Sequence, residues 1–293
     1  MIGMSQISST NNSTNSNIHP NTTSNPNQPL RPRVLSIAGT DPTGGAGAQS
    51  DLKSIMAAGG YGMSVITALV AQNTQGVREI HTPPLGFLRA QLDSVFDDVT
   101  VDAVKIGMLG DTQTIQTIRD YLQNHQVTTV LDPVAVASSG DRLLTADAED
   151  ALRDFAAASS VVTPNLPELA LLTKTDIASS EQDAVDIAAK WARETDTTVI
   201  VKLGHLAGPE AGNIAVAPNG QTHKVSSPRV ETKNTHGTGC SLSSALATRL
   251  GAGDSLENAL EWSTKWLNEA IANADKLLVG QGHGPVDHSV RLF

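Results

Sequence analysis

Residues 34–60 read VLSIAGTDPTGGAGAQSDLKSIMAAGG, which predicts a strand, a loop and a helix in that order. The run 34–38 is short and apolar on both faces, as is typical of a strand buried between two layers of helices. After the loop, Leu52 and Met56 share one apolar helical face, and the glycines at 59–60 end this helix. Such a unit is the building block of a parallel α/β sheet.

The same alternation repeats along the chain. Further short apolar runs that predict strands lie at 65–70, 103–106, 129–131, 161–162 and 199–201. Amphipathic stretches predict helices near 88–96, 115–122, 146–157, 166–173, 181–194, 241–250 and 256–275. Strands that alternate with helices form right-handed βαβ units on one parallel sheet. Around the turn 218–220, the runs 213–217 and 223–230 predict a hairpin instead. We therefore expect one three-layer α/β domain over residues 31–293.

Residues 1–30 differ from the rest of the chain, because they consist largely of Asn, Ser, Thr and Pro. Such a segment buries too little apolar surface to offset its ordering entropy. We expect a disordered tail; a segment with its own binding partner is the alternative. The tail has no basic region followed by an apolar region, so it does not resemble a secretory signal.

The composition excludes several classes of protein. No stretch approaches the roughly 18 apolar residues of a membrane-spanning helix, and a single cysteine cannot form an intramolecular disulfide. The net charge of −10 gives none of the attraction that dominates nucleic-acid binding, and no basic amphipathic segment suits a membrane surface. We expect a cytoplasmic protein that acts on a small molecule; an anionic substrate would need local donors and a bound cation.

The most specific motif is Asn234-Thr235-His236-Gly237-Thr238-Gly239-Cys240, which follows a predicted strand and opens a predicted helix. Glycines at a helix start let backbone N–H groups converge on an anion, and the helix dipole adds partial positive charge. The alternative is a turn that only begins the helix. A lone cysteine is usually a small buried hydrophobe. A helix N-terminus, however, lowers a thiol pKa, so Cys240 is a candidate nucleophile or proton acceptor.

The first glycine-rich loop along the chain, residues 39–47, directly follows the first predicted strand, and the motif at 234–240 is the second such loop. Its glycines allow a ligand to lie against the backbone, although a plain strand-to-helix turn is the alternative. The chain contains neither GxGxxG in this loop nor GxxxxGK[ST] anywhere, so the dinucleotide fingerprint and the P-loop are both absent from the sequence. Both glycine loops lie where α/β sheets bind ligands, at the carboxyl ends of strands.

Three oxygen-bearing side chains follow two neighbouring predicted strands. Asp132 ends the first, whereas Asn165 and Glu168 follow the second and share one helical face. Carboxylate and amide oxygens suit Mg²⁺. The alternative is a helix that Asn165 caps, with Glu168 completing a capping box. The sequence leaves both interpretations open.

Two further polar residues end predicted strands. Lys202 is either a solvated cap or a phosphate contact. Gln72 carries an amide that donates and accepts at once, which suits the edge of a heterocycle. His205, His236 and His283 have no HxxxH or HExxH partner, so we assign them no metal.

These residues resemble the hydroxymethylpyrimidine/phosphomethylpyrimidine kinase family. The similar blocks are 34–47, 64–74, 105–109, 163–168 and 232–240. The resemblance extends from residue 33 to about residue 288. It implies a ribokinase-like three-layer α/β/α sandwich with a mostly parallel sheet. It also implies an ATP-dependent kinase of thiamine biosynthesis that phosphorylates 4-amino-5-hydroxymethyl-2-methylpyrimidine and then its monophosphate, and it suggests a homodimer.

The resemblance assigns roles to Lys202 and to the residues of the second glycine loop, 234–240. Cys240 is the implied base for the hydroxymethyl proton. Gly237, Thr238 and Gly239 are implied to line an anion hole for the transferring phosphoryl group. Lys202 is implied to meet the phosphates of ATP.

The resemblance also assigns the substrate and metal sites. The implied pyrimidine pocket consists of Gln72, Ala46, Val70, Met108 and Val134. The implied Mg²⁺ site, with direct or water-mediated contacts, consists of Asp132, Asn165 and Glu168. Three residues depart from the expected family pattern, Ala135 and Leu203 among them. The third, Ser138, replaces a lysine that would help the loop after Asp132 to close over phosphate.

Three other functions compete with this one. A pyridoxal kinase is the main alternative, because some members of the same branch carry the cysteine loop. A Cys-His acyl-transfer enzyme would use Cys240 with His236 or His205, but it would leave the other glycine loop unexplained. A pyrimidine sensor that lacks catalysis is the third.

Overall fold

The computed structural model describes residues 31–136, 140 and 143–292. The predicted tail, residues 1–30, and Ser138 lie outside the described residues. The strands are β1 (Arg33–Ala38), β2 (Tyr61–Ile66), β3 (Leu69–Asn73), β4 (Gly76–His81), β5 (Ala103–Ile106), β6 (Thr128–Leu131), β7 (Val161–Val162), β8 (Thr198–Lys202), β9 (Glu210–Val216) and β10 (Thr222–Pro228).

The helices lie close to the predicted ranges. They are α1 (Gly47–Ala57), α2 (Leu85–Phe96), α3 (Thr112–Leu122), α4 (Glu149–Ala157), α5 (Leu166–Thr173), α6 (Glu181–Thr195), α7 (Thr238–Gly251) and α8 (Leu256–Asn273). Short 3₁₀ turns are η1 (Ala146–Ala148), η2 (Leu203–His205) and η3 (Ala274–Leu277). Within the described residues, no helix is both long and apolar enough to cross a membrane.

The main sheet has the strand order β10-β9-β8-β7-β6-β5-β1-β2. Every neighbouring pair from β8 to β2 is parallel, whereas β8 with β9 and β9 with β10 are antiparallel. The predicted hairpin is confirmed, because Thr222 pairs with Val216. Gly220 has a φ of +85°, which lets the intervening turn close. The sheet is therefore mostly parallel, as expected.

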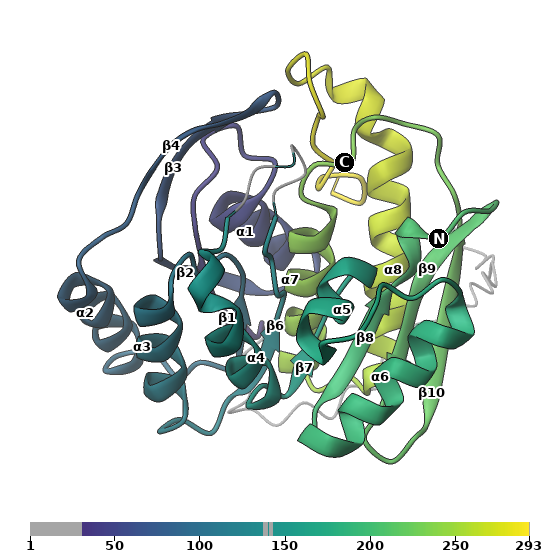
Figure 1. Ribbon diagram of the computed structural model, residues 1–293. Coiled ribbons are helices and arrows are strands. Elements are labelled where there is room, and N and C mark those ends of the chain that lie inside the picture. Colours follow the sequence, from purple (N-terminus) through teal and green to yellow (C-terminus); the bar gives the residue numbers. More distant parts are fainter. Residues whose placement is uncertain (1–30, 137–139, 141–142, 293) are drawn as a thin grey trace, which may run out of the picture. The chain divides into compact units, whose positions relative to one another are not determined.

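Helices cover both faces of this sheet (Figure 1). Successive residues of a strand point to opposite faces, so the runs that are apolar at every position supply two cores. Leu35 and Ile37 of β1 pack with α2 to α6 in one core. Val34, their neighbour in the same strand, packs with Ile55 of α1 and Leu246 of α7 in the other. The three-layer α/β architecture is thus confirmed.

The predicted strand 65–70 is wrong in one respect. It divides into the end of β2 and the start of β3, and these belong to different sheets. At the division, the Thr67 hydroxyl donates to the Met108 carbonyl at 2.7 Å, and the Thr40 N–H donates to the Ala68 carbonyl at 2.9 Å. These contacts direct the chain out of the main sheet into the antiparallel β3–β4 hairpin, which projects from it (Figure 1).

Candidate active site

A cavity of about 800 Å³ lies at the carboxyl ends of the parallel strands. Both glycine loops line it: Gly39, Thr40, Ala46 and Gly47 come from the first, and residues 235–240 from the second. The predicted site residues that line it are Gln72, Ala46, Met108, Val134, Asn165, Glu168, Lys202, Gly237, Thr238, Gly239 and Cys240. The fold therefore brings together most of the residues that the sequence singled out.

The second glycine loop forms the N-terminus of α7. Its N-cap is Gly237, which has a φ of +80° and offers no side chain to the first-turn N–H groups. A Cβ atom at this position would lie 1.8 Å from the Gly45 carbonyl oxygen, so only glycine allows the two loops to approach so closely. The first-turn N–H groups, which have no side-chain cap, and the helix dipole suit an anion here.

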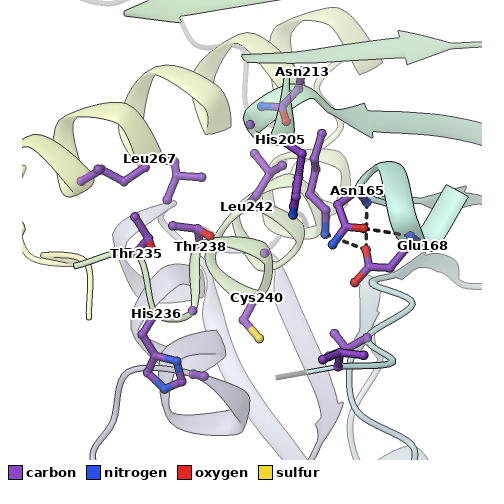
Figure 2. Close-up of a pocket in the computed structure, with 18 of the residues that line it drawn as sticks. Asn165, Glu168, His205, Asn213, Thr235, His236, Thr238, Cys240, Leu242 and Leu267 are labelled. Carbon is purple, nitrogen blue, oxygen red and sulfur yellow. Dashed lines mark hydrogen bonds and ion pairs between the residues drawn. The ribbon is translucent and has the colours of Figure 1, made fainter. Parts of the chain in front are cut away.

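Cys240 lies in the first turn of α7, and its side chain points away from the helix into the cavity (Figure 2). We expected the helix N-terminus to lower the thiol pKa. Instead, burial raises the pKa of Cys240 to about 11, against the opposing effects of Lys105 and of the Gly47 backbone N–H. Loss of water around a thiolate outweighs these favourable contacts. Cys240 is therefore a neutral thiol at pH 7.

The first glycine loop is folded around the carboxylate of Asp41, which is fully buried. Its oxygens accept hydrogen bonds from the backbone N–H groups of Thr43, Gly45 and Ala46 at 2.8–3.1 Å. The Nε2 atom of His236 in the second loop lies 2.9 Å from Oδ2 of the same carboxylate. Burial would raise the pKa of Asp41, but the hydrogen bonds from His236, Thr43 and Ala46 hold it at about 2. One carboxylate thus orders both loops.

The three oxygen-bearing residues do meet, but around a lysine. Lys202 Nζ lies 2.7 Å from Asp132 Oδ1 and 3.3 Å from Glu168 Oε2. Burial and the Asp132 charge raise the pKa of Glu168, although Lys202 opposes this. Asn165 forms the capping box, because its side chain accepts from the Glu168 N–H while the Asn165 N–H donates to the Glu168 carboxylate (Figure 2). Capping is therefore realised in this structure.

One observation still favours a cation at this place. Asp132 Oδ2 is buried and has no hydrogen-bond partner among the described residues. A Cβ atom at Gly239 would lie 3.2 Å from this oxygen, so the free lone pairs lie directly beneath the anion loop. No group of three His, Cys, Asp or Glu side chains placed to hold a metal occurs within the described ranges. The donor set fits Mg²⁺ only in its usual form, with one or two carboxylates completed by water and phosphate oxygens.

The expected pyrimidine pocket is largely assembled. Gln72, on β3, donates from Nε2 to the Thr40 carbonyl at 3.3 Å. Val70 is the exception, because it is buried and does not line the cavity. A Cβ atom at Gly39 would lie 3.6 Å from its Cγ2 and 3.0 Å from the Met108 sulfur, so Val70 supports the wall from behind.

The cavity continues beyond Lys202 into a region that the motifs did not reveal. Its walls come from β9, the segment after β10 and α8 and include Asn213, Arg229, Thr264, Leu267, Asn268 and Ile271. Asn213 Nδ2 donates to the Thr264 hydroxyl at 2.9 Å, which ties β9 to α8. The sequence predicted α8 as a helix but gave no sign that it lines the site, because its lining residues follow ordinary helical spacing.

The residues that depart from the family pattern lie in different parts of the structure. Ala135 lines the cavity, and Leu203 is buried in η2.

Lys105 also lines the cavity, although its side chain is fully buried. The sequence offered this lysine only as part of a similar block, and we had assigned it no function.

Comparison with known proteins identifies a family with these features. The model of the phosphomethylpyrimidine kinase family matches residues 41–287. The thiamine biosynthesis multifunctional protein ThiED of Corynebacterium efficiens is 60% identical over 259 residues, 88% of this chain but 35% of that protein. This chain thus spans about a third of that relative. The hydroxymethylpyrimidine/phosphomethylpyrimidine kinase of Escherichia coli (strain K12) is 44% identical over 88% of this chain and 97% of its own length.

The structural comparison supports the same conclusion about the fold. An ADP complex of pyridoxal kinase from Bacillus subtilis superposes with a TM-score of 0.81 at 29% identity, and covers 89% of this chain and 98% of that one. The ribokinase-like α/β sandwich that we expected is therefore confirmed.

Proposed function

The chain belongs to the phosphomethylpyrimidine kinase family, and we propose that it transfers the γ-phosphoryl group of ATP to hydroxymethylpyrimidine and then to its monophosphate, in thiamine biosynthesis. The observation that carries the proposal is the placement of the Cys240 side chain in one cavity with the uncapped N-terminus of α7 and with Gln72. Phosphoryl transfer requires positioning and charge stabilisation above all, and this cavity supplies both.

The pyrimidine ring binds at the end of the cavity formed by the first glycine loop. Gln72 reads its polar edge, since an amide can donate to one ring atom and accept from a neighbouring amino group. Ala46, Met108 and Val134 cover the flat faces of the ring, and Val70 holds this wall in place. The hydroxymethyl arm then extends toward Cys240.

ATP occupies the other end of the cavity, between β9 and α8. The α7 N-terminus receives the γ-phosphoryl group, where the N–H groups around Gly237, Thr238 and Gly239 stabilise the negative charge of the transition state. Lys202 contacts the phosphates. Burial would lower the pKa of Lys202, but Asp132 and Glu168 raise it, so the lysine carries its positive charge throughout.

The chemical step forms one bond and breaks one. The hydroxymethyl oxygen attacks the γ-phosphorus, the bond from that phosphorus to the β,γ-bridging oxygen breaks, and ADP leaves. The Cys240 thiolate accepts the hydroxymethyl proton and becomes a thiol. The thiol exchanges its proton with solvent, and the small thiolate fraction present at equilibrium serves the next turnover. Because the transition state is loose, the proton is transferred late in the reaction. It is therefore sufficient that a small fraction of Cys240 is in the thiolate form.

Asp132 and Glu168 would hold Mg²⁺, with Asn165 orienting Glu168 from the capping box. A bound Mg²⁺ would neutralise negative charge on the ATP phosphates. Lys202 forms ion pairs with both carboxylates. We also propose that residues 31–293 are the catalytic domain, that it acts as a cytoplasmic homodimer, and that residues 1–30 are a tail without a catalytic function.

Pyridoxal kinase is the second candidate, because a pyridoxal kinase from Bacillus subtilis shares this architecture over nearly its whole length. Both substrates are flat nitrogen heterocycles with a hydroxymethyl arm, so the cavity described here suits either. The curated relative of E. coli favours the pyrimidine. Mass spectrometry of the products tests the proposal: hydroxymethylpyrimidine should gain one phosphoryl group and then a second, whereas products phosphorylated only on pyridoxal would support the alternative.

A further inference from the structure

Lys105 is a fully buried lysine in the middle of the molecule. It lies on β5, opposite Ser36 of β1 in the parallel register, and its side chain has 0% exposure. A buried ammonium group is costly unless it is paired and hydrogen-bonded. Nothing in the proposed reaction so far uses this charge.

The lysine is held by one carboxylate. Lys105 Nζ lies 2.8 Å from both carboxylate oxygens of Asp51 on α1. Asp51 accepts two further hydrogen bonds, from the Ser36 hydroxyl at 2.6 Å and from the Ser244 hydroxyl at 2.9 Å. The carboxylate is therefore fully engaged, and the lysine has a fixed position.

This network is joined to the helix that carries the cysteine, through the hydrogen bond from Ser244 to Asp51. Ser244 follows Cys240 by four residues on α7, so both side chains lie on the same face of that helix. Lys105 and Cys240 line the same cavity, and α7 packs against β5. Gly107 keeps the space above the ammonium open, because a Cβ atom there would lie 2.7 Å from Lys105 Nζ.

We propose that Lys105, fixed by Asp51, is a positioning residue for the reaction: its buried positive charge stabilises the Cys240 thiolate that accepts the substrate proton. The inference rests on the proposed function, because it concerns the base of that reaction. The mechanism needs this counter-charge, since burial strongly disfavours a thiolate. Asp51 has a second role here, because it keeps the buried lysine protonated.

The charges around the sulfur agree with this role. Lys105 lowers the pKa of Cys240, and the N–H of Gly47 at the start of α1 acts in the same direction. Asp51 and Asp132 raise the pKa of Cys240, but each has a smaller effect than Lys105. Lys105 is thus the main group that opposes the effect of burial on this thiol.

The chain has a single cysteine, so alkylation of the folded protein by iodoacetamide reports Cys240 alone. Below the thiol pKa the alkylation rate is proportional to the thiolate fraction, and we would measure this rate at pH 8 in the wild type and in K105M, K105R and K190M. In K105M the rate should fall about tenfold or more, since an opposite charge nearby lowers a pKa by about one unit or more. K105R keeps the charge and should stay near the wild type. K190M removes an exposed charge on α6 and is the matched control.

K105M leaves Asp51 buried without its partner, so circular dichroism must first show that the variant is folded. The double variant K105M/D51N avoids this unpaired carboxylate, and its alkylation rate should still fall because Lys105 has a stronger effect on the thiol than Asp51. An unchanged rate in either folded variant would overturn the proposal, and so would failure of both to fold, which would make the pair a folding element. The alkylation needs no substrate, so absence of kinase activity would count against the proposed function alone.

Discussion

Ser241 Oγ lies 3.0 Å from His288 Nε2, which joins the residue after Cys240 to the end of the chain. The same imidazole nitrogen lies 2.9 Å from Ser50 Oγ on α1. His288 is 7% exposed and therefore has little contact with water. One buried histidine thus connects the first turns of α1 and α7, the two helices that begin at the glycine loops.

This arrangement predicts a loss of stability in mild acid. Burial, together with the nearby Lys53, lowers the pKa of His288 to about 4 from its ordinary value of 6.5. Between these values the unfolded chain binds a proton that the folded chain excludes, so stability falls as the pH drops from 6.5 toward 4. Across this whole pH range, the free energy of unfolding should fall by about 3 kcal/mol.

Urea denaturation at a series of pH values measures this effect. The variant H288Q should show a flatter dependence over the same window, because glutamine does not titrate. H81Q changes an exposed histidine at the end of β4 and should follow the wild type. If H288Q and the wild type lose stability in parallel, His288 is not the group responsible.

Removal of the thiol should affect the two phosphorylations unequally. In C240A, we expect kcat for hydroxymethylpyrimidine to fall by about 10²–10⁴, which is the usual contribution of a general base. Its KM should change little. The monophosphate presents an oxygen that is already negatively charged and needs no base, so its kcat should fall far less. An equal fall for both substrates, measured as ADP release, would show that Cys240 does not act by accepting a proton.

Gln72 should control the pyrimidine and not the nucleotide. In Q72A, loss of the hydrogen bonds to the ring should raise KM for hydroxymethylpyrimidine about tenfold, since each contributes about 1 kcal/mol. KM for ATP should stay within about twofold, because the nucleotide lies at the far end of the cavity. Q75A changes an exposed amide three residues further along and is the control. Equal effects on both KM values would remove Gln72 from the pyrimidine pocket.

Asp132 should set the requirement for magnesium. In D132N, the concentration of Mg²⁺ needed for half-maximal ADP release should rise about tenfold or more, as is usual when a carboxylate of a metal site is lost. D147N changes an exposed carboxylate in η1 and should behave as the wild type. A D132N enzyme with reduced kcat and an unchanged Mg²⁺ requirement would mean that Asp132 serves only to hold Lys202.

Local sequence signals were sufficient for much of the fold. The helix predicted at 166–173 has those bounds in the structure, because Asn165 and Glu168 form a capping box that is visible in the sequence. The run 65–70 was misleading, since a run of apolar residues gives no sign that the chain leaves one sheet for another. That change depends on the contact of Thr67 with Met108, about 40 residues away.

The sequence could predict which residues follow strands and so gather at the candidate site. It could not predict how deeply their side chains are buried. Cys240 and Lys202 reach one cavity because one begins a helix and the other ends a strand at the same edge of the main sheet, whereas Gln72 reaches it from β3 of the separate hairpin. The thiol pKa could not be predicted, because the helix N-terminus is a local feature whereas burial depends on the packed elements around the sulfur. The pairing of Lys105 with Asp51 joins residues 54 apart and leaves no periodic signal.

The central claim is best tested by ADP release from Mg²⁺-ATP with three acceptors offered in parallel: hydroxymethylpyrimidine, its monophosphate and pyridoxal. We expect turnover of both pyrimidines, with kcat/KM for hydroxymethylpyrimidine above that for pyridoxal. Turnover of pyridoxal alone would contradict the proposed substrate while leaving the fold unchanged, and absence of ADP release with all three would contradict the kinase assignment.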